Sequence, residues 1–178
     1  MGLDLVEFAF AVENAFGLYL PEPEVAELVT PGLLVDYLVK RLPPADTPQC
    51  LDQVAFHRIR KGVMLAFDQP RSAIRPDTLW ASLIPPKARR HSWELLGHAV
   101  GVPAWPKLSV WRPFSGDTET VGRTARFIAT RCPGAIKGSS QTWTREEIVE
   151  VITRLMADEL GVTRFNMTDH FVRDLKLD

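Results

Sequence analysis

The chain has 178 residues, of which 46% are hydrophobic and 24% are charged, and its formal net charge at pH 7 is -1. A chain of this length buries either one sizeable core or two small cores of roughly 80 residues each. No apolar run approaches the roughly 20 residues that a membrane span requires, and no basic stretch followed by an apolar one opens the sequence. We therefore expect a cytoplasmic protein that makes no use of a membrane.

Charge is segregated along the sequence. Residues 1–42 and 142–178 together contain 15 acidic and 7 basic side chains, whereas residues 43–141 contain 7 acidic and 14 basic ones. Two ends of one sign around a centre of the other sign indicate that the ends belong to a single structural unit.

The first predicted helix covers residues 3–16 and stops at Gly17. Its apolar residues recur near helical spacing, so we expect them to face a core. They are Leu3, Val6, Phe10 and Phe16, widened by Leu5, Phe8, Ala9 and Val12.

A second helix is predicted after a proline-containing break. Pro21 and Pro23 keep the break from continuing as helix. Thr30 then provides an N-cap, and Pro31 occupies the first helical position, where no N–H is needed. The residues expected to face inward are Leu33, Leu34, Tyr37, Leu38 and Leu42.

The centre contains a helix-like stripe from Phe56 to Phe67 and a second helix over residues 91–100. That second helix is expected to turn Trp93, Leu96 and Val100 inward. Residues 103–119 are rich in proline and tryptophan, and the pattern there predicts no regular element.

The last predicted helix has the sharpest start signal. Thr144 and Glu147 form a capping box, and Trp143 stands where it can staple onto Ile148. Gly161 ends the helix.

The two ends of the chain carry a family resemblance. Residues 171–178 read Phe-Val-Arg-Asp-Leu-Lys-Leu-Asp, and residues 1–7 read Met-Gly-Leu-Asp-Leu-Val-Glu. Joined tail to head, they resemble the F-x-x-D-L-x-L-D-S-L-D-L-V-E signature of acyl carrier proteins, in which the serine carries the phosphopantetheine arm. Residues 75–85 resemble a carrier loop, and residues 120–128 resemble the T-V-G-D-L-V-D-Y-I pattern of the family's helix IV.

The resemblance implies an all-α fold, namely an acyl-carrier-like four-helix bundle that is circularly permuted or swapped between chains. A second, degenerate acyl-carrier-like helical unit is expected inside it. Phe171 and Leu79 take the position of the residue that plugs the core in the two units. The expected boundaries are 1–42 plus 142–178 for the permuted unit, with helices II–IV before helix I; 50–133 for the insert; and 43–49 and 134–141 for the linkers.

The resemblance also bears on function. The position of the carrier serine falls at Met1 or Gly2, and in the inserted copy near Pro86 or Lys87. We therefore expect a non-catalytic interaction or scaffold module with no prosthetic group. Its partner is expected to be an acidic carrier protein or a carrier-protein-dependent enzyme, and a domain-swapped homo-oligomer remains open.

Two sets of charged residues are candidates for partner binding. Asp4 and Glu7 lie on the outward face of the first helix, where the family uses acidic groups to meet basic partners. The centre has a basic cluster that is either a solvated surface, a docking site for an acidic protein, or a nucleic-acid site. Its candidates are Arg58, Lys61, Arg89 and Arg90, with Arg60 and Lys87 beside them.

Other chemistry finds little support in the sequence. Ser92 imitates the carrier serine and leaves open a true carrier protein modified there. The four histidines show no metal-ligand spacing, and no catalytic set can be assembled. Cys50 and Cys132 flank the central unit, so a disulfide is geometrically allowed, although a cytoplasmic chain keeps such thiols reduced.

Overall fold

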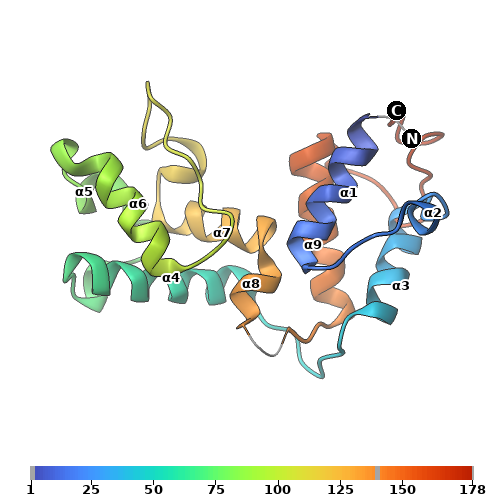
Figure 1. Cartoon of the computed structure of the whole chain (residues 1–178), viewed down its shortest axis with the longest axis horizontal. Coiled ribbons are helices and arrows are strands. Elements are labelled where there is room, and N and C mark those ends of the chain that lie inside the picture. The colour runs from blue at the N-terminus through green and yellow to red at the C-terminus, as the bar shows by residue number, and fades with distance from the viewer. Residues whose placement is uncertain (1–2, 139–140, 178) are drawn as a thin grey trace. The chain divides into compact units, whose positions relative to one another are not determined.

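The computed structural model describes residues 3–138 and 141–177, and the regular elements in these ranges are all helical (Figure 1). The prediction of an all-α chain is confirmed. The chain divides into two compact units: unit 1 comprises Met1–Gln49 and Lys137–Asp178, and unit 2 comprises Cys50–Ile136. None of the described helices combines the length and the apolarity needed to cross a bilayer.

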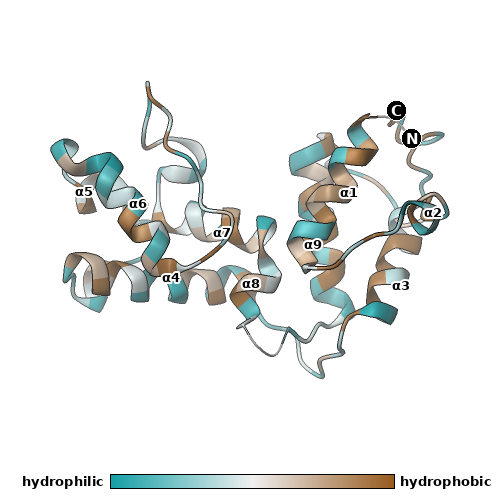
Figure 2. Ribbon diagram, viewed as in Figure 1, coloured by the Kyte–Doolittle hydropathy of each residue, from teal (hydrophilic) through white to brown (hydrophobic). Residues whose placement is uncertain are grey.

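Unit 1 is built around its last helix, α9 (Arg145–Leu160), against which both α1 (Leu3–Phe16) and α3 (Pro31–Arg41) pack. A short helix, α2 (Glu22–Val25), lies between α1 and α3 in the chain. The helices from the two ends of the chain therefore share one core. Their apolar residues concentrate on the inward faces (Figure 2), and the fully buried ones include Val12, Val35, Leu38, Ile152 and Leu155.

The C-terminal segment after α9 is held to the N-terminal helices by main-chain hydrogen bonds. The Phe171 N–H donates to the Val29 carbonyl at 3.0 Å, and the Gly32 N–H donates to the Met167 carbonyl at 2.8 Å. The Phe171 ring meets the ring of Phe8 on α1 edge-on, with 6.0 Å between centroids. The two ends thus complete each other's packing within one chain. The predicted junction between Asp178 and Gly2 lies outside the described residues.

The capping box at the start of α9 is present as predicted. The Thr144 N–H donates to Glu147 Oε2 at 2.9 Å, and the Glu147 N–H donates to Thr144 Oγ1 at 3.2 Å. Glu147 Oε1 also accepts from Lys137 Nζ at 2.6 Å, and the two side chains are only 1% and 2% exposed. A helix cap and a buried ion pair therefore share one carboxylate.

The segments that lead into and out of unit 2 are paired inside unit 1. The Trp143 N–H donates to the Pro43 carbonyl at 2.8 Å, and the Ala45 N–H donates to the Trp143 carbonyl at 2.9 Å. The Gln49 N–H donates to Glu147 Oε1 at 2.9 Å. The predicted linker 43–49 is thus tied to the start of α9. The predicted linker 134–141 is wrong at its start, because residues 134–136 lie in α8 and belong to unit 2.

Unit 2 is built around α4 (Leu51–Phe67), which packs against α6 (Arg89–Val100) and α7 (Val121–Arg131). Two shorter helices are α5 (Trp80–Leu83) and α8 (Pro133–Lys137), the latter ending at the unit boundary. Single 3₁₀ turns occur at Arg71–Ala73, Pro86–Ala88 and Gly116–Thr118. The predicted inward residues of α6 are buried: Trp93, Leu96 and Val100.

Unit 2 repeats the main-chain hydrogen bonds that hold the C-terminal segment in unit 1. The Trp80 N–H donates to the Glu119 carbonyl at 3.1 Å, and the Gly122 N–H donates to the Pro76 carbonyl at 2.8 Å. The donors and acceptors have the same spacing along the chain in both units. In each unit a threonine N-cap, Thr30 or Thr120, stands two residues before the glycine that donates.

The buried plug of unit 2 is Trp80, so the prediction for Leu79 is wrong by one residue. Trp80 is fully buried and donates from Nε1 to Thr124 Oγ1 at 2.9 Å, whereas Leu79 is 50% exposed. Trp80 meets Trp93 edge-on, with 5.0 Å between ring centroids. Tryptophan buries more apolar surface than leucine, and its N–H finds a partner here, which explains the shift.

Three residues predicted to face the core lie on the surface instead. Leu3 is 72% exposed, Phe10 is 58% exposed and Leu33 is 45% exposed. The faces of α1 and α3 that are buried are rotated from the predicted stripes. The residues buried on α1 are Leu5, Phe8, Val12, Ala15 and Phe16, and those on α3 are Pro31, Leu34, Val35 and Leu38.

Candidate functional site

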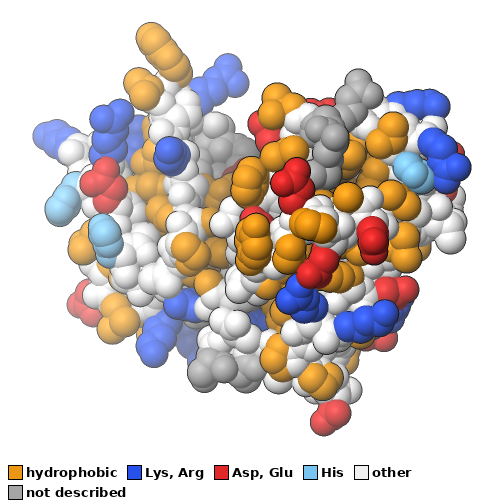
Figure 3. Space-filling view, turned by 45° about the vertical axis from the view of Figure 1, so that its right-hand side comes forward, with side chains coloured by type: hydrophobic (Ala, Val, Ile, Leu, Met, Phe, Trp, Pro, Cys, Tyr) orange, Lys and Arg blue, Asp and Glu red, His pale blue; other side chains and the backbone are white. Residues whose placement is uncertain are grey.

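The outward face of α1 combines apolar and acidic side chains. Leu3 and Phe10 are largely exposed, and Asp4 and Glu7 are exposed beside them. We call these four residues the α1 face. Hydrophobic and acidic side chains lie together on this side of unit 1 in Figure 3. α1 contains no basic residue, so the charged side chains on this face are all acidic.

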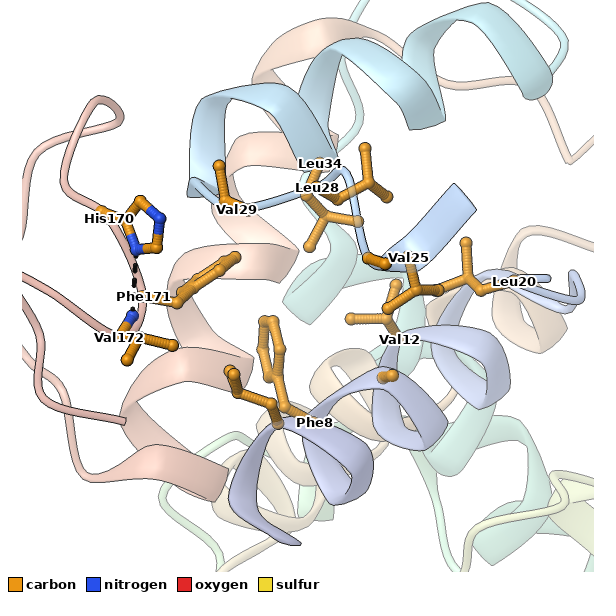
Figure 4. A pocket seen from close by; sticks show the side chains of 13 residues that line it. Phe8, Val12, Leu20, Val25, Leu28, Val29, Leu34, His170, Phe171 and Val172 are labelled. Carbon is orange, nitrogen blue, oxygen red and sulfur yellow. Dashed lines mark hydrogen bonds between the residues drawn. The ribbon is translucent and has the colours of Figure 1, made fainter. Parts of the chain in front are cut away.

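Behind this helix, unit 1 contains an apolar cavity of about 240 Å³ (Figure 4). Phe8 and Val12 of α1 form one wall, and Phe171 of the C-terminal segment points into it. Val25 and Leu34, from α2 and α3, close the other side. The cavity therefore lies where the N-terminal helices meet the C-terminal segment.

Among the described residues that line the cavity, His170 is the one polar side chain. Its Nδ1 accepts the Val172 N–H at 3.2 Å (Figure 4), and the main-chain N–H of His170 donates to Asp174 Oδ2 at 2.8 Å. The first of these bonds ties the imidazole to its own turn. The described lining includes no carboxylate, hydroxyl or thiol that could act on a substrate with it.

A polar brace fixes α2 against α3 next to the cavity. Tyr37 Oη donates to Glu24 Oε2 at 2.5 Å, and the Arg41 guanidinium donates to the same carboxylate oxygen at 2.8 Å. The hydrogen bonds from Tyr37 and Arg41 lower the pKa of Glu24. Partial burial, followed by the hydrogen bond to Glu24, raises the pKa of Tyr37. This brace orients the helix that carries Val25 into the cavity wall.

The four basic candidates in unit 2 have different roles. Arg58 donates to the main-chain carbonyls of Val100, Ala135 and Gly101 at 2.7–2.9 Å, so its guanidinium joins the end of α6 to the chain after α7. The other three candidates are closer to solvent. Lys61 and Arg90 are exposed, and Arg89 is half-buried with its guanidinium 5.1 Å from the centre of the Phe114 ring.

A second groove was missed in the sequence because it depends on residues 103–119, for which no element is predicted. It measures about 310 Å³ and lies between α6 and this irregular segment. Basic and aromatic side chains line it, together with one acidic residue. The lining is Arg90, Trp93, Glu94, Trp105, Pro106, Lys107 and Leu108.

Ser92 lies in the first turns of α6 rather than at its N-cap, which is Ala88. It directly precedes the buried Trp93 and is itself half-buried. An N-terminal helix position with free N–H groups is where an incoming phosphate is favoured, and Ser92 stands past it.

The remaining groups are structural in their surroundings. Cys50 and Cys132 carry free thiols; Cys132 is buried, and that burial raises the pKa of its thiol. Within residues 3–138 and 141–177, no group of three or more His, Cys, Asp or Glu side chains could hold a metal ion.

Comparison with known proteins found no match: no family model, no curated protein and no solved structure is similar to this chain. Function must therefore be argued from the residues and their geometry.

Proposed function

We propose that this protein is a non-catalytic interaction module built from two acyl-carrier-like units, neither of which carries a phosphopantetheine arm. Unit 1 is the circularly permuted one, with α9 as helix I and α1 as the recognition helix that partners contact. Unit 2 is a divergent copy. The α1 face binds a basic partner of the kind that docks on carrier proteins.

The proposal rests on the surface and the composition of α1. α1 displays the acidic and apolar surface of a recognition helix, yet Leu3–Phe16 contains no serine, threonine, cysteine or tyrosine. A carrier needs a hydroxyl at the start of this helix, where free N–H groups and the helix dipole favour the incoming phosphate. The docking surface is therefore kept on a helix that has no nucleophile.

The repeated hydrogen bonds support the view that the units are copies. Phe8 on α1 and Trp93 on α6 each meet the plug of their unit edge-on. Six residues before them stand Gly2 and Lys87, the positions that the resemblance assigns to the carrier serine. By the same correspondence, Ser92 matches Glu7, which lies along the recognition helix and not at its start.

Attachment of the arm is the direct test. The full chain is incubated with a phosphopantetheinyl transferase and coenzyme A, with a known acyl carrier protein as positive control, and its intact mass is recorded. We expect no change in mass. A gain of one phosphopantetheine would contradict the proposal, and the same experiment on Ser92→Ala would show whether Ser92 is the acceptor.

Docking is tested with the same transferase as a binding probe, because it is one of the enzymes that must contact a carrier's recognition helix. We expect its addition to shift amide resonances of α1 and to leave those of Asp4→Lys/Glu7→Lys unshifted. Asp46→Lys/Asp158→Lys, which reverses two exposed acidic residues of unit 1 that are not part of α1, is the matched control and should respond like the wild type. Equal responses from both double variants would refute a role for the α1 face.

A further inference from the structure

The irregular segment between α6 and α7 ends in an exposed apolar tip. Trp111 is 92% exposed and Val110 is 73% exposed, and Lys107 and Arg112 are exposed next to them in the chain. We call Lys107, Val110, Trp111 and Arg112 the tip. Figure 3 shows hydrophobic side chains projecting at the free end of this segment, with Lys or Arg side chains beside them. Tryptophan is enriched among the residues that contribute most to binding at protein interfaces, so the exposed Trp111 is a candidate anchor for a partner.

The tip is presented by an anchored segment. Trp93 Nε1 donates to the Pro106 carbonyl at 2.7 Å, and Trp105 Nε1 donates to the Trp93 carbonyl at 3.1 Å. On the far side of the tip, the Phe114 ring lies 5.9 Å from that of Trp93. Both stems of the segment are thus fixed to one buried tryptophan of α6. This arrangement reduces the entropy lost when the tip binds a partner.

The groove of about 310 Å³ shares Lys107 with the tip, and like the tip it is basic and partly apolar. Arg90 and Lys107 place two cations on it, against the single carboxylate of Glu94, and Trp105 and Leu108 add apolar surface. Unit 2 as a whole contains 13 basic and 6 acidic residues. The surface therefore fits a partner that is acidic and partly apolar.

The same chain carries such a surface. Unit 1 contains 16 acidic and 8 basic residues, and its α1 face sets Asp4 and Glu7 beside exposed Leu3 and Phe10. We propose that the tip and groove of unit 2 bind the α1 face of a second copy of this chain. This inference rests on the proposed function, because it assigns a partner to the same face of α1.

A second copy matches these features better than a nucleic acid does. A single-strand binder needs several exposed aromatic side chains along a basic track. Here Trp111 is the exposed one, Trp105 is half-buried, and Glu94 interrupts the cations of the groove. A contact between unlike surfaces is heterologous, so subunits join head to tail.

Sedimentation velocity and native mass spectrometry of the full chain, from about 1 μM to about 1 mM, test this inference. We expect larger species to grow with concentration and to decline as salt rises, because the contact is partly electrostatic. Asp4→Lys/Glu7→Lys and Lys107→Glu/Arg112→Glu should each stay monomeric. Mixed together they should associate again, because each variant then offers its partner a surface of opposite charge.

Two further variants test the apolar part of the contact. Trp111→Ala should weaken association by on the order of thirtyfold, as expected for an aromatic anchor, while Trp111→Phe should retain most of it. Leu65→Ala, on a side chain that is 71% exposed on α4, and Arg71→Glu/Arg126→Glu, on exposed cations that belong to neither the tip nor the groove, are the controls and should associate normally.

A wild-type chain that stays monomeric over this range, or a mixture of the two charge-reversed variants that does not associate, would overturn the inference. Neither outcome affects the proposed function, which is judged by the mass measurement and by transferase binding at concentrations below self-association. Conversely, a chain that gains a phosphopantetheine arm and still self-associates would contradict the proposed function and leave the self-association in place.

Discussion

The two units of this chain share a pair of main-chain hydrogen bonds, which we call the frame, and they differ in the aromatic side chains that pack beside it. Unit 1 sets Phe8 against Phe171 edge-on, and an apolar cavity of about 240 Å³ lies beside the pair. Unit 2 sets Trp93 against Trp80 in the same positions, and the Trp80 indole N–H is satisfied by Thr124. The hydrogen bonds of this frame therefore tolerate a change of core side chains from phenylalanine to the larger tryptophan.

The surfaces of the two units diverge further than their frames. Unit 1 has twice as many acidic as basic residues, whereas unit 2 has about twice as many basic as acidic ones. Surface charge influences partner choice and association rate rather than the fold. The units can therefore serve different partners, or each other's copies, without a change of architecture.

The strongest test of the comparison is removal of the plug from each unit. Phe171→Ala and Trp80→Ala should each lower the free energy of unfolding by about 3–5 kcal/mol, because each empties a buried aromatic site. Hydrogen exchange, read separately in α9 and α4, locates the loss in the affected unit. Leu79→Ala is the matched control, since Leu79 is half exposed and should lose far less. A Leu79→Ala loss as large as that of Trp80→Ala would contradict the assigned plug.

A smaller loss is expected where the chain enters and leaves unit 2. Glu147→Gln should destabilise unit 1 by about 3 kcal/mol, because it removes the carboxylate charge from a buried ion pair. Glu146→Gln, at the neighbouring exposed position, should lose far less stability. Chemical denaturation with a probe in α9 measures both, and equal losses would argue against the buried pair.

The paired glycines provide a test of the shared frame itself. A methyl group on Gly32 would lie 2.7 Å from the Met167 carbonyl oxygen, and one on Gly122 would lie 2.8 Å from that of Pro76. Gly32→Ala and Gly122→Ala should each cost about 1–3 kcal/mol, because the main-chain contact must open to admit the methyl. Hydrogen exchange at the glycine amides reports the opening. If only one of the two variants lost stability, the two glycines would not have equivalent roles in the two units.

The smallest effect is expected from the brace of unit 1, and it depends on pH. The folded pKa of Glu24 is lowered below its unfolded value, so the stabilisation is present above the unfolded pKa near 4.5 and is lost as pH falls through the folded value. A carboxyl-detected NMR titration should show Glu24 titrating below the ordinary pKa of a glutamate. In Glu24→Gln the stability difference from the wild type should shrink in acid. A normal Glu24 pKa would contradict the hydrogen bonds from Tyr37 and Arg41 that form the brace.

Local signals predicted the element ends well. The capping box at Thr144 and the N-cap at Thr30 depend on a few adjacent residues, and both are present. The buried face of α6 was also predictable, because Trp93, Leu96 and Val100 recur at helical spacing on one side of the helix.

The face of α1 was not predictable in the same way. Leu3 and Phe10 belong to a helix that is apolar almost all round, so periodicity alone could not select the side that packs against α9. Packing selected it. The exposed Trp111 was missed for a related reason: its segment follows no regular period, and its course depends on two indole hydrogen bonds to distant main-chain atoms.

By itself the sequence determined that the chain is helical, where its capped helices start, and how its charge is divided, because these depend on neighbouring residues and composition. The tertiary structure alone decided that Trp80 rather than Leu79 fills unit 2, that a cavity remains in unit 1, and that the α1 face and the tip are exposed. These features depend on which of several apolar side chains reach a limited interior, and that competition is resolved only when the helices pack.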